Sequence, residues 1–397
     1  MSNLVPEGWA ISNINRTCDI LDSKRVPLNS QERALRKGDY PYYGANGIQG
    51  HIDDYIFEGE HVLLAEDGGN FDQWQSRPIS YLVSGKFWVN NHAHILKAKQ
   101  EHETQFIHYS LVHKNILKHI NGGTRAKLNQ ADMRDITILM PPLPEQQKIA
   151  KILTSVDEVI EKTQAQIDKL KDLKTGMMQE LLTNGIGHTE FKDSPVGRIP
   201  AEWEVKTVES ILSVIIDYRG KAPPKSEVGV PLITAKNIRN GFINQEPREY
   251  IYEEQFNSWM VRGMPQFGDV FITTEAPLGN VAKVPNYKFA IGQRVLTLRP
   301  NELVCTEFLL FILQSEKFKK ELDLQSTGST VAGIKQSTFR KILLPVPSID
   351  EQIKISESLN SVVRRSDVIK DKLQSFKSLK KALMQDLLTG KVRVKVS

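Results

Sequence analysis

The chain has 397 residues, of which 40% are hydrophobic and 25% are charged, and these proportions are typical of a globular protein with two or three domains. Its two cysteines are too few for a disulfide framework or a cysteine zinc site, its longest apolar run is too short to span a membrane, and its first residues do not resemble a signal peptide, so we expect a protein of the reducing cytoplasm. The net charge of +5 permits nucleic-acid binding but does not require it, because many proteins that bind no nucleic acid are equally basic.

The first third of the chain predicts a mixed α/β module. Trp9 opens it, and we expect this side chain to anchor the edge of the domain. Short apolar runs separated by Gly, Asn and Asp indicate strands, and one longer run indicates a helix. The predicted elements are strands at 61–65, 81–83, 93–96 and 136–139, a helix at 104–119 and a loop at 122–124.

A long helix is predicted from 144 to 184, because apolar residues recur at alternating steps of four and three over five heptads. The same stretch recurs without a gap 206 residues later, from 350 to 390, and both copies end in Met-Gln-acid-Leu-Leu-Thr. Such a seam indicates a helix that packs along a partner helix. Its positions are Ile149, Leu153, Val156, Ile160, Ile167, Leu170, Met177 and Leu181 in the first copy, and Ile355, Leu359, Val362, Ile369, Leu373, Phe376, Leu383 and Leu387 in the second.

The residues between the two helices repeat the plan of the first module. Trp203 matches Trp9, and strands at 270–273 and 294–298, a helix at 306–324 and a loop at 328–330 match their counterparts. In this alignment Glu66 corresponds to Glu275 and His92 to Gln293. Asp350 is expected to cap the second helix, and the alternating tail at 391–396 is expected to form an edge strand.

This repeat predicts an α+β fold in which two α/β domains are joined by two long helices, packed as an antiparallel coiled coil with an internal pseudo-two-fold repeat. Such a chain could read two half-sites on DNA, with the helix pair fixing the gap between them. It could equally be a coiled-coil adaptor that holds two protein-binding domains apart. The geometry alone does not choose between these functions.

Several motifs resemble those of the specificity (S) subunits of type I restriction–modification systems, over nearly the whole chain. The most specific are the Pro-Glu-Gln-Gln start and Leu-Leu-Thr-x-Gly end of 144–185, with the second copy ending in Leu-Leu-Thr-Gly at 387–390. The runs at 42–47, 90–94, 268–270 and 292–294 also resemble the target-recognition domains of that family. The start of the second helix departs from the pattern, because it reads Ile-Asp-Glu-Gln-Ile.

The resemblance implies a DNA-recognition subunit whose two domains each bind one half of a bipartite, asymmetric DNA site. Double-stranded DNA and two modification subunits, which bind S-adenosylmethionine and methylate adenine, are the implied partners; restriction subunits that cut and translocate DNA with ATP can join them. The implied organisation is a first target-recognition domain (1–143), a central long helix (144–184), a linker with the second target-recognition domain (185–343), a C-terminal long helix (344–390) and a tail (391–397).

Catalytic and cofactor motifs are missing from the sequence, as a non-catalytic subunit would require. There is no phosphate-binding loop, because Gly220-Lys221 and Gly390-Lys391 are followed by Ala and Val, and no Asn/Asp-Pro-Pro-aromatic run like that of amino-methyltransferases. We therefore expect no catalytic residue, cofactor or metal in this chain. His92 and His94 have metal-ligand spacing, but without a third ligand they are expected to be structural. A self-contained DNA-modifying enzyme with scattered active-site residues remains the rival hypothesis.

Features shared by the two modules cannot distinguish two different half-sites, so they are expected to be scaffold or phosphate contacts. These are Thr124, Arg125, Lys127, Thr330 and Lys335. Base readers are expected where the modules diverge, on loops whose side chains can pair with base edges. These are Tyr42, Tyr43, Asn46, Gln49, Gln73 and Arg77 in the first module, and Arg219, Lys221, Lys225, Lys236, Asn237 and Arg239 in the second.

Four polar residues interrupt the seam, namely Thr163 and Lys174 in the first helix and Ser366 and Lys380 in the second. One hypothesis is that they control the register of the helices at a cost in stability. The other is that the two lysines lie beside DNA or a partner subunit.

Overall fold

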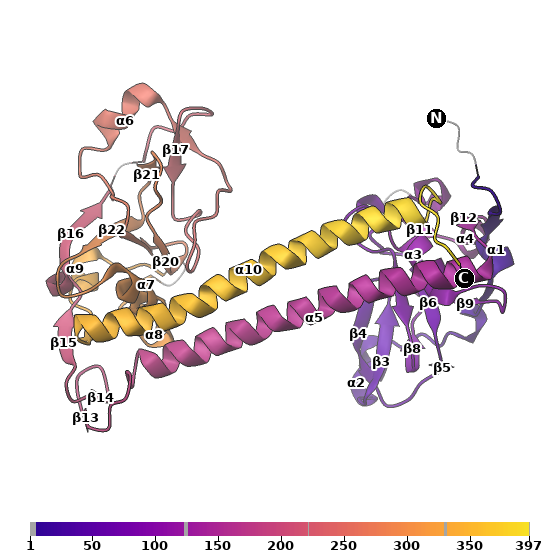
Figure 1. Ribbon diagram of the computed structural model, residues 1–397, viewed down its shortest axis with the longest axis horizontal. Coiled ribbons are helices and arrows are strands. Elements are labelled where there is room, and N and C mark those ends of the chain that lie inside the picture. Colours follow the sequence, from indigo (N-terminus) through magenta and orange to yellow (C-terminus); the bar gives the residue numbers. More distant parts are fainter. Residues whose placement is uncertain (1–4, 123–125, 221, 329–331, 397) are drawn as a thin grey trace. The chain divides into compact units, whose positions relative to one another are not determined.

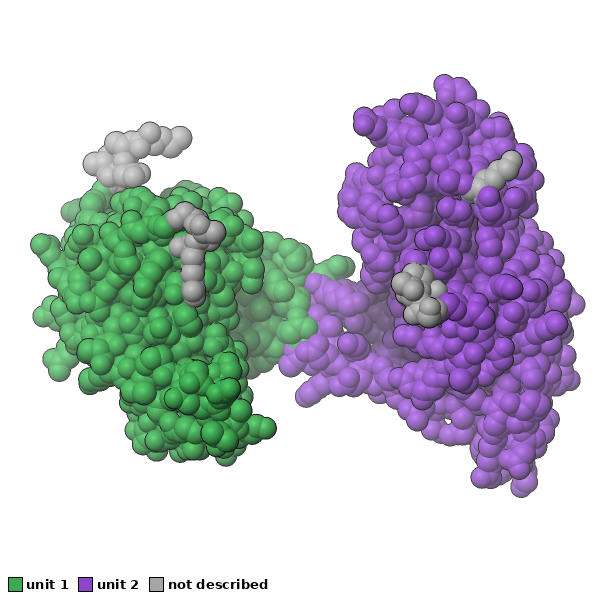
Figure 2. Space-filling model, turned by 180° about the vertical axis from the view of Figure 1, so that it is seen from behind, with its two compact units in different colours: residues 1–164, 371–397 green, residues 165–370 purple. Residues whose placement is uncertain are grey.

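The computed structural model describes residues 5–122, 126–220, 222–328 and 332–396. The chain divides into two compact units, one formed by residues 1–164 with 371–397 and the other by 165–370 (Figure 2). Each unit therefore holds one globular domain together with part of each long helix.

The globular domain of the first unit is built on two four-stranded sheets (Figure 1). One sheet has the order β2(Cys18–Ile20), β9(Ala93–Ala98), β6(His61–Ala65), β7(Ser80–Val83), and the other has the order β4(Gly47–Ile52), β3(Tyr40–Gly44), β8(Lys86–Val89), β5(Phe57–Glu58). Two antiparallel pairs, β1(Ala10–Asn13) with β12(Thr137–Met140) and β10(Ile120–Asn121) with β11(Lys127–Leu128), complete the strands. The short helices are α1(Ile14–Thr17), α2(Ser30–Leu35), α3(Thr104–Val112) and α4(Gln130–Arg134), with 3-10 turns at Asp22–Lys24, Phe71–Gln73 and Leu117–His119.

The second unit contains one four-stranded and one three-stranded sheet. The first has the order β16(Leu212–Asp217), β22(Val295–Pro300), β19(Val270–Thr274), β20(Leu278–Lys283), and the second has the order β18(Tyr250–Ile251), β17(Val230–Ile233), β21(Ala290–Ile291). The pairs are β13(Phe191–Lys192) with β14(Ile199–Pro200) and β15(Glu204–Thr207) with β23(Leu343–Val346). Its short helices are α6(Glu253–Trp259), α7(Thr306–Gln314), α8(Glu316–Leu324) and α9(Gln336–Phe339), with a 3-10 turn at Glu209–Ile211.

The predicted internal repeat is confirmed by the strand order. The sheet β2-β9-β6-β7 of the first unit and the sheet β16-β22-β19-β20 of the second have the same antiparallel neighbours in the same sequence order. Trp9 and Trp203 are both buried at the entrance to the pairs β1–β12 and β15–β23, as expected. The two second sheets also share their central pairing, because β3 and β17 each have an antiparallel neighbour (β4, β18) and a parallel neighbour (β8, β21). They differ in the extra strand β5 of the first unit and in the connection between the antiparallel strands, which is 45–46 in the first unit and 234–249 in the second.

The two long helices, α5(Leu143–Leu181) and α10(Ile349–Leu387), each have 39 residues. All sixteen seam residues are buried or half-buried, which confirms the apolar face read from the sequence. The helices run antiparallel within each unit. In the first unit Leu153 shares a core cluster with Leu387, and in the second unit Leu359 shares one with Leu181.

Some predicted boundaries are wrong for local reasons. The helix expected at 104–119 ends at Val112, where the imidazole of His113 turns to the Trp74 carbonyl at 2.7 Å. The helix expected at 306–324 is two helices, because Ser315 is extended (φ −65°, ψ 147°) and its hydroxyl accepts a hydrogen bond from the Phe318 amide as the cap of α8.

The C-terminal helix and the tail also differ from expectation. Asp350 lies inside the first turn of α10, and the Ser348 hydroxyl instead accepts a hydrogen bond from the Glu351 amide, at 3.4 Å. The described part of the tail forms no strand. Its side chains are used instead in contacts at the start of α5.

Candidate nucleic-acid interface

Tyr42, in strand β3, and Asn237, in a turn, belong to the buried scaffold, and this corrects the expectation that they read bases from exposed loops. Tyr42 is only 1% exposed, and its hydroxyl bonds to the Leu28 backbone. Asn237 is 4% exposed; its side chain accepts a hydrogen bond from the Thr234 amide and donates to the Asn244 carbonyl. Both side chains are fully engaged inside the protein, because loop polar groups that become buried must be satisfied there.

The other candidates of the first domain lie at or near the surface. Tyr43 is half-buried, packs edge-to-face on Phe87, and has a pKa raised by burial. Asn46 and Gln49 are exposed, although Asn46 donates to the Gly68 carbonyl and Gln49 accepts from Asn90. Exposed Gln73 and Arg77 contact each other across one turn, at 3.4 Å. Their remaining donors and acceptors are available to a ligand.

In the second domain the candidate cations are spread over different segments. Lys236 is exposed, Arg239 is half-buried, and Lys225 pairs with Glu249 at 2.6 Å. Arg219 is half-buried and donates to the Ile334 carbonyl at 3.0 Å. Arg219 thus lies beside the segment that follows the loop at 328–330.

Of the shared candidates, Lys127 and Lys335 are exposed, and Lys127 lies 3.2 Å from Glu66. The remaining candidates lie outside the described residues. They are Thr124, Arg125, Lys221 and Thr330.

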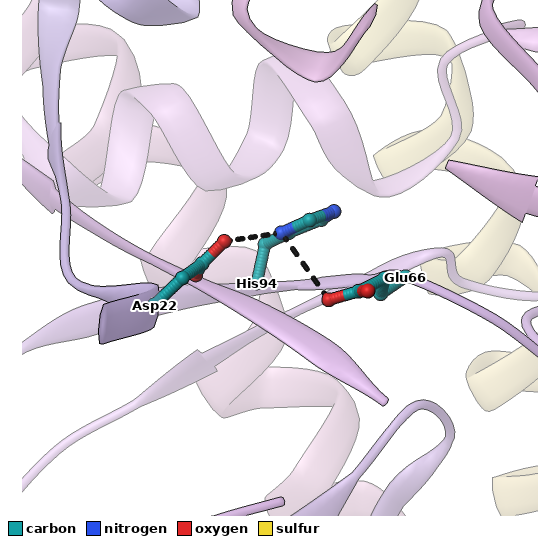
Figure 3. Close-up of side chains that lie close together, drawn as sticks. All are labelled: Asp22, Glu66 and His94. Carbon is teal, nitrogen blue, oxygen red and sulfur yellow. Dashed lines mark hydrogen bonds and ion pairs between the residues drawn. The ribbon is translucent and has the colours of Figure 1, made fainter. Parts of the chain in front are cut away.

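Asp22, Glu66 and His94 form a buried network at the end of the β6–β9 strand pair (Figure 3). His94 Nδ1 lies 2.6 Å from Asp22 Oδ2 and 3.6 Å from Glu66, and its Nε2 lies 2.9 Å from the Leu128 carbonyl. Burial by itself raises the pKa of Asp22, but the hydrogen bond and charge of His94, together with the Ile95 amide and the charge of Arg25, outweigh burial and hold that pKa below its usual value.

These three side chains are close enough to share a cation, since their ligand atoms lie within 4.8 Å of one another. However, Glu66 is already paired with Arg25 at 2.6 Å and with Lys127, so its charge is neutralised by the protein. His92 turns away to Asp67, so it does not join His94 as a ligand. We interpret the network as a structural ion-pair cluster that fixes the strand ends.

A glutamate in the first turn of each long helix holds the entrance tryptophan of its own domain. Glu145 accepts a hydrogen bond from Trp9 Nε1 at 3.1 Å and from Arg393 through two bonds of 2.8 Å. These bonds with Arg393 outweigh burial and lower the pKa of Glu145. This role was not predicted from the sequence, although a glutamate stands at the same position of both helix copies.

The second unit has the equivalent arrangement with a different cation. Glu351 accepts a hydrogen bond from Trp203 Nε1 at 2.9 Å, and His188 Nε2 lies 2.9 Å from its other oxygen. Arg393 and His188 each come from the segment that follows a long helix. The two contacts therefore fix each domain to the helix pair of its own unit.

The lysines that interrupt the seam have partners inside their own units. Lys380 pairs with Asp157 at 2.5 Å and lies over the ring of Tyr109, whose hydroxyl donates to the same carboxylate at 2.8 Å. Lys174 lies over the ring of Phe311, and burial, followed by repulsion from Lys370, lowers its pKa. These contacts support the structural interpretation of the two lysines.

The remaining interruptions are Thr163 and Ser366. Thr163 is buried, and its hydroxyl donates to the Val159 carbonyl at 2.6 Å, so the helix itself satisfies it. Ser366 is half-buried.

The chain belongs to the family of type I restriction–modification specificity subunits. The family model described as the type I restriction modification DNA specificity domain matches it twice, at residues 6–172 and 200–377. It is 28% identical to the type I restriction enzyme MjaVIII specificity subunit of Methanocaldococcus jannaschii over 98% of this chain and 94% of that protein.

Two solved structures share the fold. The S subunit of a type I restriction–modification system from M. genitalium matches with a TM-score of 0.62 and 16% identity, over 98% of both chains. A chain from a study of complex assembly and conformational transition of the type I R-M system matches with a TM-score of 0.55 and 17% identity, over 98% of this chain and all of that one. No helix among the described residues is long and apolar enough to cross a membrane.

Proposed function

We propose that this chain is the DNA-recognition subunit of a type I restriction–modification complex. Each globular domain reads one half of a bipartite, asymmetric DNA site, and the helices fix the spacing and dock two modification subunits. The observation that carries the proposal is the duplicated domain: the sheet order is the same in both units, and the family model matches each copy separately.

The same comparison indicates which parts of each domain are scaffold and which parts read bases. The sheet β2-β9-β6-β7 and its counterpart, with the paired strands of the second sheets, are the shared scaffold, while the loops of the second sheets differ between the units. Two different half-sites require two different reading surfaces on one scaffold. We therefore place base reading on the loops and strand ends that diverge.

In this proposal the methyl transfer belongs to the modification subunits, which bind S-adenosylmethionine, and restriction subunits can join the complex to cut DNA. The complex acts in the cytoplasm. The purified chain alone should transfer no methyl group to DNA and should gain activity only with a modification subunit. Methylation by the chain alone would contradict the proposal.

A salt titration separates a DNA reader from a protein-only adaptor. Binding of the complex to a DNA duplex that carries its site should weaken steeply between 50 and 200 mM salt, by a factor on the order of 10³ or more if six or more phosphates are contacted. An adaptor would have no measurable affinity for the duplex at either salt concentration. A matched duplex with a scrambled site should lose the specific part of the binding and keep the salt-dependent part.

A further inference from the structure

The end of β6 and the residues before β9 in the first domain match the end of β19 and the residues before β22 in the second. This structural match differs by one residue from the alignment made on the sequence. The same backbone hydrogen bonds occur in both: Glu66 N to His92 O (2.9 Å) and Thr274 N to Arg294 O (3.0 Å), then Leu128 N to Glu66 O (2.7 Å) and Ile334 N to Thr274 O (3.0 Å). Glu66 is therefore equivalent to Thr274, and His92 to Arg294. The alignment of Glu66 with Glu275 and His92 with Gln293 is wrong by one residue at each position.

This register places a carboxylate and a basic side chain at the same point of both domains. In the first, His92 Nδ1 lies 2.5 Å from Asp67 Oδ1. In the second, Arg294 Nη2 lies 3.4 Å from Glu275 Oε1. The backbone of Asp67 forms an isolated antiparallel β-bridge with Lys127, and that of Glu275 forms one with Gly333. Both ion pairs therefore lie at the same edge of the shared sheet.

Both basic side chains are oriented by the carboxylate but remain open to solvent. The side chain of His92 is 35% exposed and that of Arg294 is 48% exposed. Nδ1 of His92 is hydrogen-bonded to Asp67. Nε2 of His92 has no hydrogen-bond partner among the residues that the structure describes. The guanidinium of Arg294 has five N–H donors, of which the carboxylate can occupy only some.

The backbone conformation of Arg294 is a second, independent indication that this residue has a functional role. Its φ is +72°, in the left-handed region that residues other than Gly, Asn and Asp seldom adopt. Such a conformation persists where the surrounding structure imposes it, and it is concentrated at functional sites. Arg294 stands immediately before β22, and its guanidinium lies 3.4 Å from Glu275.

The surroundings of the pair in the second domain favour an anionic ligand. Arg219 donates to the Ile334 carbonyl, and Arg262 donates to the Arg219 carbonyl at 2.6 Å. With Arg294 and the neighbouring Lys335, four cations lie along this segment, against the two carboxylates Asp217 and Glu275. Cations concentrated in this way attract the phosphates of nucleic acid.

The surroundings of His92 are not net basic, because Arg25 and Lys127 face the carboxylates Asp22 and Glu66. A role for His92 must therefore come from a directed hydrogen bond rather than from attraction to phosphate. Its free Nε2 can make such a bond, as can the fork of Arg294, which matches O6 and N7 of guanine.

We propose that His92 and Arg294 are equivalent specificity-determining residues, each contacting a base edge in the half-site read by its own domain. Asp67 and Glu275 position them. In both domains the carboxylate orients the basic side chain. The basic group is an imidazole in one domain and a guanidinium in the other, and this difference changes which base is preferred. This proposal rests on the proposed function, since it names residues of the same DNA-reading surface.

The test uses the complete chain with its modification subunits and a library of duplexes in which every position of the site is varied. The variant Arg294→Ala should reduce discrimination at one base pair of the second half-site by about tenfold or more, the size expected for a lost bidentate base contact. His92→Ala should do the same at one base pair of the first half-site only. The spacer length and the other half-site should not change.

Two further variants keep the test informative if alanine disturbs folding. Arg294→Lys keeps the charge but loses the planar fork, so discrimination should fall while overall affinity is largely kept. The double variant Asp67→Glu with His92→Arg transplants the second pair into the first domain and should change the preferred base there. His102→Ala, at a half-buried histidine before α3, and Arg340→Ala, at the ion pair with Glu209, lie outside the diverging loops and are matched controls that should leave the base preferences unchanged.

The outcomes are distinct. An equal loss of affinity for every duplex would identify phosphate contacts or a folding defect and overturn the assignment, as would unchanged base preferences in both variants. Failure of the proposed function would look different, because the unaltered complex itself would then show no preference among the duplexes.

Discussion

The two recognition domains are alike where they meet the long helices and in the pairing of their sheets, and they differ in the connections of the second sheet. Glu145 with Trp9 and Glu351 with Trp203 make the same contact at the start of each helix. The strands β3 and β17 have matching neighbours, but the first unit adds β5, and residues 45–46 join β3 to β4 whereas residues 234–249 join β17 to β18. The attachment and the sheet pairing are therefore the same in both units, while the connections proposed to read DNA differ.

The largest expected effect concerns the part that the units share. Leu153 and Leu359 occupy equivalent positions and are both fully buried. Leu153→Ala and Leu359→Ala should each lower the free energy of unfolding by about 2–5 kcal/mol, because a cavity remains where the side chain was packed. Urea denaturation measures both values.

The matched controls are Leu173→Ala and Leu379→Ala, at half-exposed positions of the same helices, and they should cost less than about 1 kcal/mol. A small effect at one buried leucine and a large one at the other would show that the two units are not stabilised alike.

A second comparison concerns the aromatic residue under each seam lysine. The first unit has Tyr109 bonded to Asp157, whereas the second has Phe311, and Val363 stands where Asp157 would be. Phe311→Tyr should lower the free energy of unfolding by about 1–3 kcal/mol, because it buries a hydroxyl without that acceptor. Tyr109→Phe should cost about 0.5–1.5 kcal/mol through the lost hydrogen bond. Thermal or urea unfolding of both variants measures the two losses. A larger loss for Tyr109→Phe than for Phe311→Tyr would contradict the prediction.

The smallest expected effect tests the attachment of the first domain. Replacing Glu145 by Gln removes the charge that Arg393 and Trp9 bind, and should lower the free energy of unfolding by about 1 kcal/mol at pH 7. The pKa of Glu145 is lowered in the folded protein, so its stabilising contribution is present above the unfolded pKa, near 4.5, and is lost as the pH falls through the folded pKa. The difference between the two proteins should therefore shrink below about pH 4.5.

Urea denaturation at a series of pH values measures this difference. Glu158→Gln, at an exposed glutamate of the same helix, is the control and should show little effect at any pH. A difference between Glu145→Gln and the unaltered protein that stays constant down to pH 3 would contradict the assignment.

The sequence was sufficient for the helices because their information is periodic and local. The seam from Ile149 to Leu181 and its copy identify the buried face without any knowledge of the partner, and the strand at 61–65 coincides with β6. The break at Ser315 was not predictable in the same way, because a serine within an apolar pattern ends a helix only where its hydroxyl caps the next one.

The candidate site was less predictable, because it depends on contacts between distant segments. Tyr42 and Asn237 have side chains that could pair with base edges, and only the folded structure shows that both are buried. His92 and Arg294 stand in runs that resemble those of the family, but insertions between the strands shift the sequence alignment by one residue and hide their equivalence. The backbone hydrogen bonds of the strand ends restore that register.

The measurement that tests the proposed function most directly is a map of methylated adenines in cells that carry this chain with its modification subunits. We expect one bipartite asymmetric motif. Exchange of residues 205–343 for the corresponding domain of another specificity subunit should then change one half of the motif and leave the other half and the spacer intact. A continuous motif, or a domain exchange that alters both halves together, would contradict the claim that each domain reads its own half-site.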